Sequence, residues 1–307
     1  MASEATKIMA PAESKVLTVK PDRMKINFIP NVVFSQVPSR GYQNVALQMD
    51  ILRPAHKEKM PAILYIPGGG FINANRANAM QERMELAEAG YVVASMTYRV
   101  APTAQFPQPL EDVKAAIRYL KANGEKFDID PNRIGVMGGS AGGYLAAMAG
   151  TTSGLKDFDK GDNLQVDSTI QCAVDLYGLS DLTKIGDDYS KGVQETHKSA
   201  GATEALWVNG SPVFGGKDGG ILNNLEAAEK ANPIHYIHST SAPMLLMHGT
   251  ADAVVSPSQT DLLYQALRQK GIPAQRYIIP NAGHGGVYWV QRPVMQVILS
   301  FFNTYLK

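Results

Sequence analysis

The sequence predicts an α/β fold with a mostly parallel sheet that is covered by helices on both faces. Short, continuous apolar segments alternate along the chain with longer amphipathic ones, as buried parallel strands alternate with their covering helices. The chain has 307 residues, of which 45% are hydrophobic and 19% charged, and this length is sufficient for a large core. We therefore expect a large domain over residues 31–307, preceded by an N-terminal arm over residues 1–30.

The predicted strands are short apolar segments that end at turn residues. An early edge strand covers residues 45–52 and is closed by Pro54, because proline donates no hydrogen bond to a sheet. Further strands are expected at residues 62–66, 91–96, 134–137, 170–176, 244–247 and 275–279.

The predicted helices alternate with these strands. Asn78 is the expected N-cap of the first helix, and Gly90 and Gly271 are expected to end helices because glycine favours the left-handed conformation found there. The helices are expected at residues 79–89, 110–122, 144–149, 259–270 and 287–306. This order of elements is that of consecutive strand–helix units in a parallel sheet.

Residues 182–221 interrupt the alternation. They contain eight glycines and few periodic apolar residues, apart from residues 205–208. Loops this long in compact domains are usually functional or disordered. The segment is therefore interpreted as a short lid or cap over the active site, with a surface insertion as the alternative.

The strongest candidate for a catalytic residue is Ser140. Residues 138–142 read Gly-Gly-Ser-Ala-Gly, which fits the G-x-S-x-G nucleophile elbow, and they lie between a predicted strand and a predicted helix. A serine on such a tight turn has a strained backbone that exposes its hydroxyl group, and small neighbours allow close packing. The start of the helix then directs backbone N–H groups toward an oxyanion that forms beside the serine.

A serine nucleophile needs a base and a third group that orients the base. Of six histidines, His284 lies in the loop directly after the last predicted strand, at the sheet edge where open α/β proteins place their sites. Asp252 follows the preceding strand, which keeps the chain order serine, acid, histidine of this kind of scaffold. Asp181 is the rival acid, although it also suits a capping position in a turn. The sequence thus predicts Ser140, Asp252 and His284 as a catalytic triad.

A glycine-rich loop is the expected oxyanion hole. Residues 67–71 read Pro-Gly-Gly-Gly-Phe and follow the strand predicted at residues 62–66, which is where the lipase and esterase pattern places this loop. Consecutive glycines bring unhindered backbone N–H groups close to a substrate carbonyl.

With these motifs the chain resembles the α/β-hydrolase serine esterases. It is similar to the hormone-sensitive-lipase-like carboxylesterases and, more closely, to the feruloyl and acetylxylan esterases that act on plant cell-wall esters. The resemblance implies the α/β-hydrolase fold, with Ser140 as nucleophile, His284 as base and Asp252 as the group that orients it. The matching motifs span about residues 40–306 and lie at residues 67–71, 98–102, 106–107, 111–113, 130–135, 138–143, 175–182, 248–252 and 283–285.

The resemblance also identifies the donors of the oxyanion hole. It implies the backbone N–H groups of Gly68, Gly69 and Ala141, with Gly70 as a substitute. One departure from the family pattern concerns this loop, because Pro67 stands where the family usually has a histidine that braces the glycines. The departure puts the shape of the loop in question, and the fixed φ of proline is expected to stiffen it instead.

The expected function is that of a serine carboxylesterase acting through an acyl-enzyme on small-acyl or hydroxycinnamoyl (feruloyl) esters of plant cell-wall polysaccharide. Four aromatic residues are expected to form a wall for a phenolic acyl group, with packing in the core as the alternative. They are Phe71, Trp207, Tyr288 and Trp289. An acetyl group is equally admissible. The alternative functions are an amidase or peptidase-type serine hydrolase and a non-catalytic binding protein of the same fold.

Composition narrows the range of partners. The net charge of +1 and the scattered basic residues give no reason to expect a nucleic-acid partner, and no apolar run has the length of a membrane span. The single cysteine, Cys172, lies in an apolar run, so an internal disulfide is not possible. No cluster of His, Cys and carboxylate residues has the spacing of a zinc site, and residues 138–143 lack the Lys-Ser/Thr ending of a phosphate loop, so no metal or other cofactor is expected. The first 20 residues do not resemble a signal peptide, which suits a cytoplasmic protein and equally an exported one whose leader is absent from this chain. The oligomeric state is not predicted.

Overall fold

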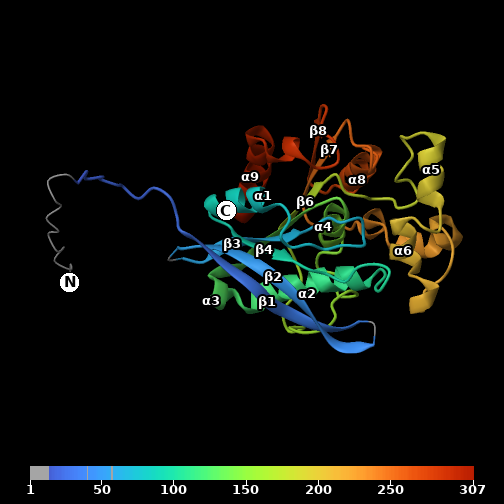
Figure 1. Cartoon of the computed structure of the whole chain (residues 1–307), viewed down its shortest axis with the longest axis horizontal. Helices are drawn as coiled ribbons and strands as arrows, with labels where there is room; N and C mark the ends of the chain where they lie inside the picture. Colours follow the sequence, from blue (N-terminus) through green and yellow to red (C-terminus); the bar gives the residue numbers. More distant parts are fainter. Residues whose placement is uncertain (1–13, 40, 57) are drawn as a thin grey trace.

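The centre of the computed structural model is an eight-stranded sheet with the strand order β1-β2-β4-β3-β5-β6-β7-β8 (Figure 1). Residues 14–39, 41–56 and 58–307 are described. Strand β2 (Tyr42–Pro54) runs antiparallel to β1 (Ile26–Ser39) and to β4 (Val92–Met96), and the other neighbours are parallel. The remaining strands are β3 (Met60–Ile66), β5 (Ile129–Gly139), β6 (Cys172–Leu176), β7 (Met244–Gly249) and β8 (Ala274–Ile279). The predicted mostly parallel sheet is confirmed.

Helices cover both faces of the sheet, as predicted. Alternate residues of β3 point into two separate apolar clusters, Leu64 into one and Ile63 into the other. The cluster around Ile63 includes residues of α1 (Met80–Glu88) and α9 (Arg292–Leu306). The cluster around Leu64 is larger and contains residues of α2 (Gln108–Ala122), α4 (Ala141–Thr151) and α8 (Ser258–Gln269). The core therefore lies in two layers, one on each side of the sheet.

Shorter helices complete the fold. They are α3 (Gly124–Phe127), α5 (Lys191–Lys198), α6 (Thr203–Asn209) and α7 (Leu225–Lys230), with 3₁₀ turns η1 (Pro212–Phe214), η2 (Ile221–Asn224), η3 (Pro233–Tyr236) and η4 (Val287–Val290). Figure 1 shows α5 and α6 at the right-hand end of the molecule, so the segment 182–221 is folded rather than an irregular loop. No helix in the described part of the chain is both long and apolar enough to cross a membrane.

The N-terminal strands differ from the prediction. The strand predicted at residues 45–52 is not an edge strand, because β1 lies outside it. The expected boundary at residue 30 falls inside β1, while the first 13 residues of the arm lie outside the described residues. Strand β1 lacks a clean apolar alternation because Asn31 has a positive φ of 57° and the register with β2 shifts between Ile29 and Val32.

Two helix ends also differ. Asn78 is not an N-cap: Ala79 takes that position in the left-handed conformation, and no side chain caps the helix. The helix expected over residues 287–306 is two elements, η4 and α9, because Gln291 has an extended backbone and Pro293 stands in the first turn of α9.

Candidate active site

Ser140 lies at a strained turn between β5 and α4. Its backbone has φ 57° and ψ −126°, which is unusual for a residue with a side chain. Neighbouring glycines make this turn sterically feasible. A Cβ atom on Gly142 would lie 2.0 Å from the carbonyl oxygen of Ile66, and one on Gly138 would lie 2.2 Å from that of Gly142. The elbow therefore packs directly against the end of β3, and the serine side chain stands at the carboxyl edge of the sheet.

The three predicted triad residues lie together. His284 Nε2 is 2.8 Å from Ser140 Oγ, and His284 Nδ1 is 2.8 Å from Asp252 Oδ2. His284 comes from the loop after β8, and Asp252 from the loop after β7. The geometry is that of a nucleophile, a base and a group that orients the base. Asp181, the rival acid, accepts hydrogen bonds from Thr183 and pairs with Lys184, so it serves a local turn instead.

Asp252 is surrounded by donors. The backbone N–H groups of Val254 and Val255 donate to Oδ1 at 2.9 and 3.0 Å, and both His284 and His248 lie within contact of Oδ2. Burial by itself raises the pKa of this carboxyl group, but the hydrogen bonds from His248, His284 and Val255 outweigh it and hold the pKa well below its usual range. Asp252 is therefore an ionised acceptor that fixes the Nδ1–H tautomer of His284.

His248 is a site residue that the sequence did not single out. It is fully buried, with Nε2 at 3.2 Å from Asp252 Oδ2 and 3.0 Å from the carbonyl oxygen of Val255. Its Nδ1 lies 3.2 Å from Thr260 Oγ1, which leaves Nε2 to donate toward the carboxylate. The available signal was the four-residue spacing between His248, at the end of β7, and Asp252, in the loop that follows.

The segment 182–221 supports the loop that carries Asp252. The Tyr189 hydroxyl donates to the backbone carbonyl of Asp252 at 3.0 Å, and the carbonyl of Ile185 accepts from Ser256 N–H at 3.1 Å. Asp188 accepts from Ser258 N–H at 3.1 Å and from the Ser256 hydroxyl. These contacts tie the loop that carries Asp252 to the segment 182–221.

The glycine loop lies against the nucleophile. A Cβ atom on Gly68 would lie 3.1 Å from Ser140 Cβ. The N–H groups of Gly68 and Gly69 donate to no acceptor within residues 14–39, 41–56 and 58–307. Ala141 is the first residue of α4, so its N–H has no acceptor within the helix. These N–H groups are thus free to bind an oxyanion beside Ser140.

The brace expected from the family histidine at position 67 is provided by other residues. The buried Tyr98 hydroxyl donates to the carbonyl oxygen of Pro67 at 2.8 Å, and Ala101 N–H donates to the carbonyl oxygen of Phe71 at 2.9 Å. The loop is thereby held at both ends from the segment after β4.

Most of the predicted aromatic wall is core. Phe71, Trp207 and Trp289 are only 2%, 0% and 1% exposed, which is the core packing weighed as the alternative. The Phe71 ring lies 4.5 Å from that of Trp207, and Trp289 donates to the carbonyl of Gly283 at 3.1 Å, beside His284. These side chains anchor the glycine loop and the histidine loop. Tyr288 is 41% exposed but does not line the pocket beside Ser140.

A cavity of about 400 Å³ opens beside Ser140 and His284, here named the active-site pocket. Besides these residues and the glycine loop, its lining includes Tyr65, Asn78, Glu82, Tyr177 and Val254. None of the described residues of 182–221 lines it.

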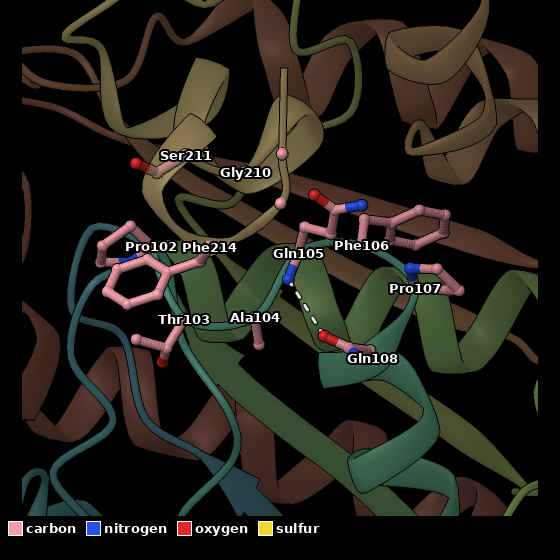
Figure 2. A pocket seen from close by; sticks show the side chains of 12 residues that line it. Pro102, Thr103, Ala104, Gln105, Phe106, Pro107, Gln108, Gly210, Ser211 and Phe214 are labelled. Carbon is pink, nitrogen blue, oxygen red and sulfur yellow. Dashed lines mark hydrogen bonds between the residues drawn. The ribbon is translucent and has the colours of Figure 1, made fainter. Parts of the chain in front are cut away.

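A second cavity, of about 280 Å³, lies between residues 102–108 and residues 210–216 (Figure 2). Figure 2 shows Gln105 N–H donating to Gln108 Oε1, at 3.3 Å, on its floor. Residues 210–216 of the insertion thus face the segment after β4. The expectation that residues 182–221 form a lid over Ser140 remains a prediction.

Comparison with known proteins agrees with this arrangement. A family model described as BD-FAE matches residues 49–267. Esterase LipC of Mycobacterium tuberculosis is 30% identical over 227 residues, which cover 73% of this chain and 53% of LipC. The chain spans about half the length of the first curated relatives it matches.

Two solved structures have a similar fold. A truncated form of a carbohydrate esterase from gut microbiota has a TM-score of 0.78 and 28% identity, over 93% of this chain and 98% of that one. An acetyl ester-xyloside bifunctional hydrolase from Caldicellulosiruptor lactoaceticus has a TM-score of 0.66 and 26% identity, over 85% and 88%. The chain therefore belongs to the BD-FAE family and has the α/β-hydrolase fold of these esterases.

Proposed function

We propose that this protein is a serine carboxylesterase that hydrolyses small-acyl or hydroxycinnamoyl (feruloyl) esters of plant cell-wall polysaccharide. The observation that carries the proposal is the pair of 2.8 Å contacts that link Ser140 to His284 and His284 to Asp252. Ionised Asp252 and free N–H groups beside the serine complete the set of groups that acyl transfer requires.

In this mechanism Ser140 Oγ attacks the ester carbonyl carbon while His284 Nε2 takes its proton. The N–H groups of Gly68, Gly69 and Ala141 bind the oxyanion, and His284 then protonates the leaving alcohol. Water, deprotonated by His284, attacks the acyl-enzyme and releases the acid by the same route. Removal of one oxyanion donor typically lowers kcat by about 10²- to 10³-fold, so these N–H groups make a large contribution in addition to that of the triad.

The names of similar proteins support the polysaccharide part of the proposal. The carbohydrate esterase and the acetyl ester-xyloside hydrolase resemble this chain over most of its length. The aromatic residues do not favour a feruloyl over an acetyl group, because three of the four that were expected to contact a phenolic acyl group are buried in the core.

A fluorophosphonate probe tests the reaction class. We expect it to label Ser140, and we expect Ser140→Ala to abolish both the labelling and the hydrolysis of p-nitrophenyl acetate. Failure to label a folded protein would favour the non-catalytic alternative, and cleavage of a p-nitroanilide in preference to the ester would favour the amidase. Rates on methyl ferulate, p-nitrophenyl acetate and acetylated xylan then decide the acyl group.

A further inference from the structure

One part of the active-site pocket carries polar side chains that have no hydrogen-bond partner among the residues the structure describes. Tyr65, Asn78, Glu82 and Tyr177 line it together with Ser140 and His284. Within the described part of the chain, none of these four side chains has a hydrogen-bond or ion-pair partner. We name them the polar wall. Polar groups at a partly buried site normally pair with protein or with water, so groups around a cavity that have no protein partner are available to a ligand.

Glu82 is the one carboxylate of the pocket among its described lining residues, and it is half-buried. The neighbouring cation, Arg83, forms no ion pair with Glu82 in the described part of the chain, although its buried Nη1 has no hydrogen-bond partner there. Its Nε and Nη2 donate to the carbonyl oxygens of Asn78 and Ala77 at 2.9 and 3.1 Å, and its guanidinium lies 6.0 Å from the centre of the Tyr65 ring. Both carboxylate oxygens of Glu82 are therefore left as acceptors for a ligand.

The two tyrosines of the polar wall, Tyr65 and Tyr177, supply hydrogen-bond donors. Burial and the Glu82 carboxylate raise the pKa of both Tyr65 and Tyr177, and the Tyr177 hydroxyl also raises that of Tyr65, so both phenols remain protonated. The Tyr177 hydroxyl is close to the nucleophile, because a Cβ atom on Gly139 would lie 2.7 Å from it, and its ring lies 4.9 Å from that of His284. A ligand group bound here is next to the reacting ester.

We propose that the polar wall binds the alcohol moiety of the ester, that this moiety is a neutral sugar residue, and that Glu82 is its specificity determinant. The inference rests on the proposed function. An acetyl group has no hydroxyl and a feruloyl group has one, whereas a sugar residue has several that can donate to Glu82 and accept from the phenols. The carboxylate also disfavours an anionic alcohol, since two like charges would share a partly buried pocket.

The test compares acetate esters that differ only in the alcohol. The substrates are a monoacetylated methyl xyloside, cyclohexyl acetate and an acetylated methyl glucuronoside. In Glu82→Gln, kcat/KM for the xyloside should fall about 10- to 100-fold, as for loss of a hydrogen bond to a charged group, and by at least tenfold more than for cyclohexyl acetate. The value for the anionic glucuronoside should rise relative to the xyloside. Glu85→Gln is the matched control, because Glu85 lies on the next turn of α1, outside the pocket, and should change nothing.

Binding to Ser140→Ala protein gives a readout that does not depend on hydrolysis. Methyl xyloside should shift NMR signals of this protein, and the additional Glu82→Gln change should remove the shifts. Equal losses on all three esters, or xyloside binding that survives Glu82→Gln, would overturn the assignment of the polar wall. A wild-type protein that binds the xyloside but hydrolyses no ester would instead overturn the proposed function.

Discussion

Asp252 and Glu82 are two carboxylates of the same active site in opposite situations. Asp252 is buried, and its oxygens contact two backbone N–H groups and two imidazoles. Glu82 is half-buried at the pocket, and its oxygens meet no partner among the described residues. The protein fixes the Asp252 carboxylate through these contacts, whereas the Glu82 carboxylate is available to a ligand that enters the pocket.

The difference separates two uses of polar groups. A fully paired carboxylate has one orientation and can orient a base, because each contact removes rotational freedom before substrate arrives. An unpaired carboxylate adds little to the stability of the fold and can discriminate among ligands. We call Asp252 and the residues that hold the triad and the glycine loop the paired side, and we call the polar wall the open side. Substitutions on the paired side should change catalysis and stability, whereas substitutions on the open side should change selectivity.

The largest effect is expected from Asp252→Asn. An asparagine at this position would stabilise the wrong tautomer of His284, with the proton on Nε2, which then cannot take the proton from Ser140. We expect kcat to fall about 10⁴-fold with the fold intact. Steady-state kinetics on p-nitrophenyl acetate measures the loss.

Asp181→Asn is the control for this prediction, since Asp181 was the rival acid and contacts Thr183, Lys184 and Asn232 rather than His284. Its activity should remain close to that of the wild type. A larger loss in Asp181→Asn than in Asp252→Asn would reverse the assignment of the acid.

A third carboxylate, Asp175 at the end of β6, sharpens the comparison because it is buried but only half paired. Gly178 N–H donates to Oδ1 at 2.8 Å, while Oδ2 has no partner in the described part of the structure. Burial raises the pKa of Asp175 to about 7, against the Gly178 hydrogen bond, which lowers it. Between the ordinary pKa of an aspartate and about 7, the folded protein keeps a proton that the unfolded chain has lost. Stability therefore falls as pH rises through this window and stays reduced above it.

Asp175→Asn should remove this contribution, which amounts to a few kcal/mol at about 1.4 kcal/mol per pKa unit. Denaturant unfolding at about pH 5 and about pH 8 measures it. The wild type should lose more stability than the variant between the two conditions. Parallel losses in the two proteins would mean that Asp175 is ionised in the fold at both pH values.

The triad could be predicted from sequence because each member follows a strand. Ser140 stands in a local motif, and Asp252 and His284 lie in the loops after two successive parallel strands, whose carboxyl ends meet at one edge of the sheet. The same logic predicts the order of strands and helices in the core of the fold. What it uses is local pattern and topology, and neither requires knowledge of side-chain packing.

Packing decides what the sequence could not predict. Phe71 and Trp207 are far apart in the chain, and only the folded structure stacks them in the core rather than beside the substrate. In the sequence, Glu82 has the pattern of an ordinary surface residue of a short helix. Only the folded structure brings α1 to the same pocket as the nucleophile elbow. The spacing of His248 and Asp252 in the sequence does not by itself show that the His248 ring turns back to the Asp252 carboxylate.

His248 is a positioning residue on the paired side, and His248→Phe removes its donor while keeping a ring. We expect kcat to fall about 10- to 100-fold, as for loss of a hydrogen bond to a charged group, with little change in KM. His248→Gln should recover part of the loss, because its amide nitrogen reaches about as far as Nε2. A loss in KM alone, or no recovery with glutamine, would count against positioning.

Tyr98→Phe tests the paired side by the removal of one oxygen atom. The Tyr98 hydroxyl donates to the buried carbonyl of Pro67, so its loss leaves that carbonyl unsatisfied at the foot of the glycine loop. We expect about 1–3 kcal/mol less stability, measured by denaturant unfolding, and a severalfold lower kcat. Unchanged stability would show that the hydrogen bond from Tyr98 is not needed to hold the loop.

Tyr177→Phe is the same deletion on the open side and should have the smallest effect on the fold. Its hydroxyl has no partner in the described part of the protein, so stability should remain within about 0.5 kcal/mol of the wild type. The kcat/KM ratio between the acetylated xyloside and cyclohexyl acetate should nevertheless fall, because the lost donor faces the alcohol. Comparison of Tyr98→Phe with Tyr177→Phe therefore distinguishes a hydroxyl that stabilises the fold from a hydroxyl that binds the ligand. Equal destabilisation of both would place Tyr177 on the paired side and leave Glu82 as the main polar contact for the sugar.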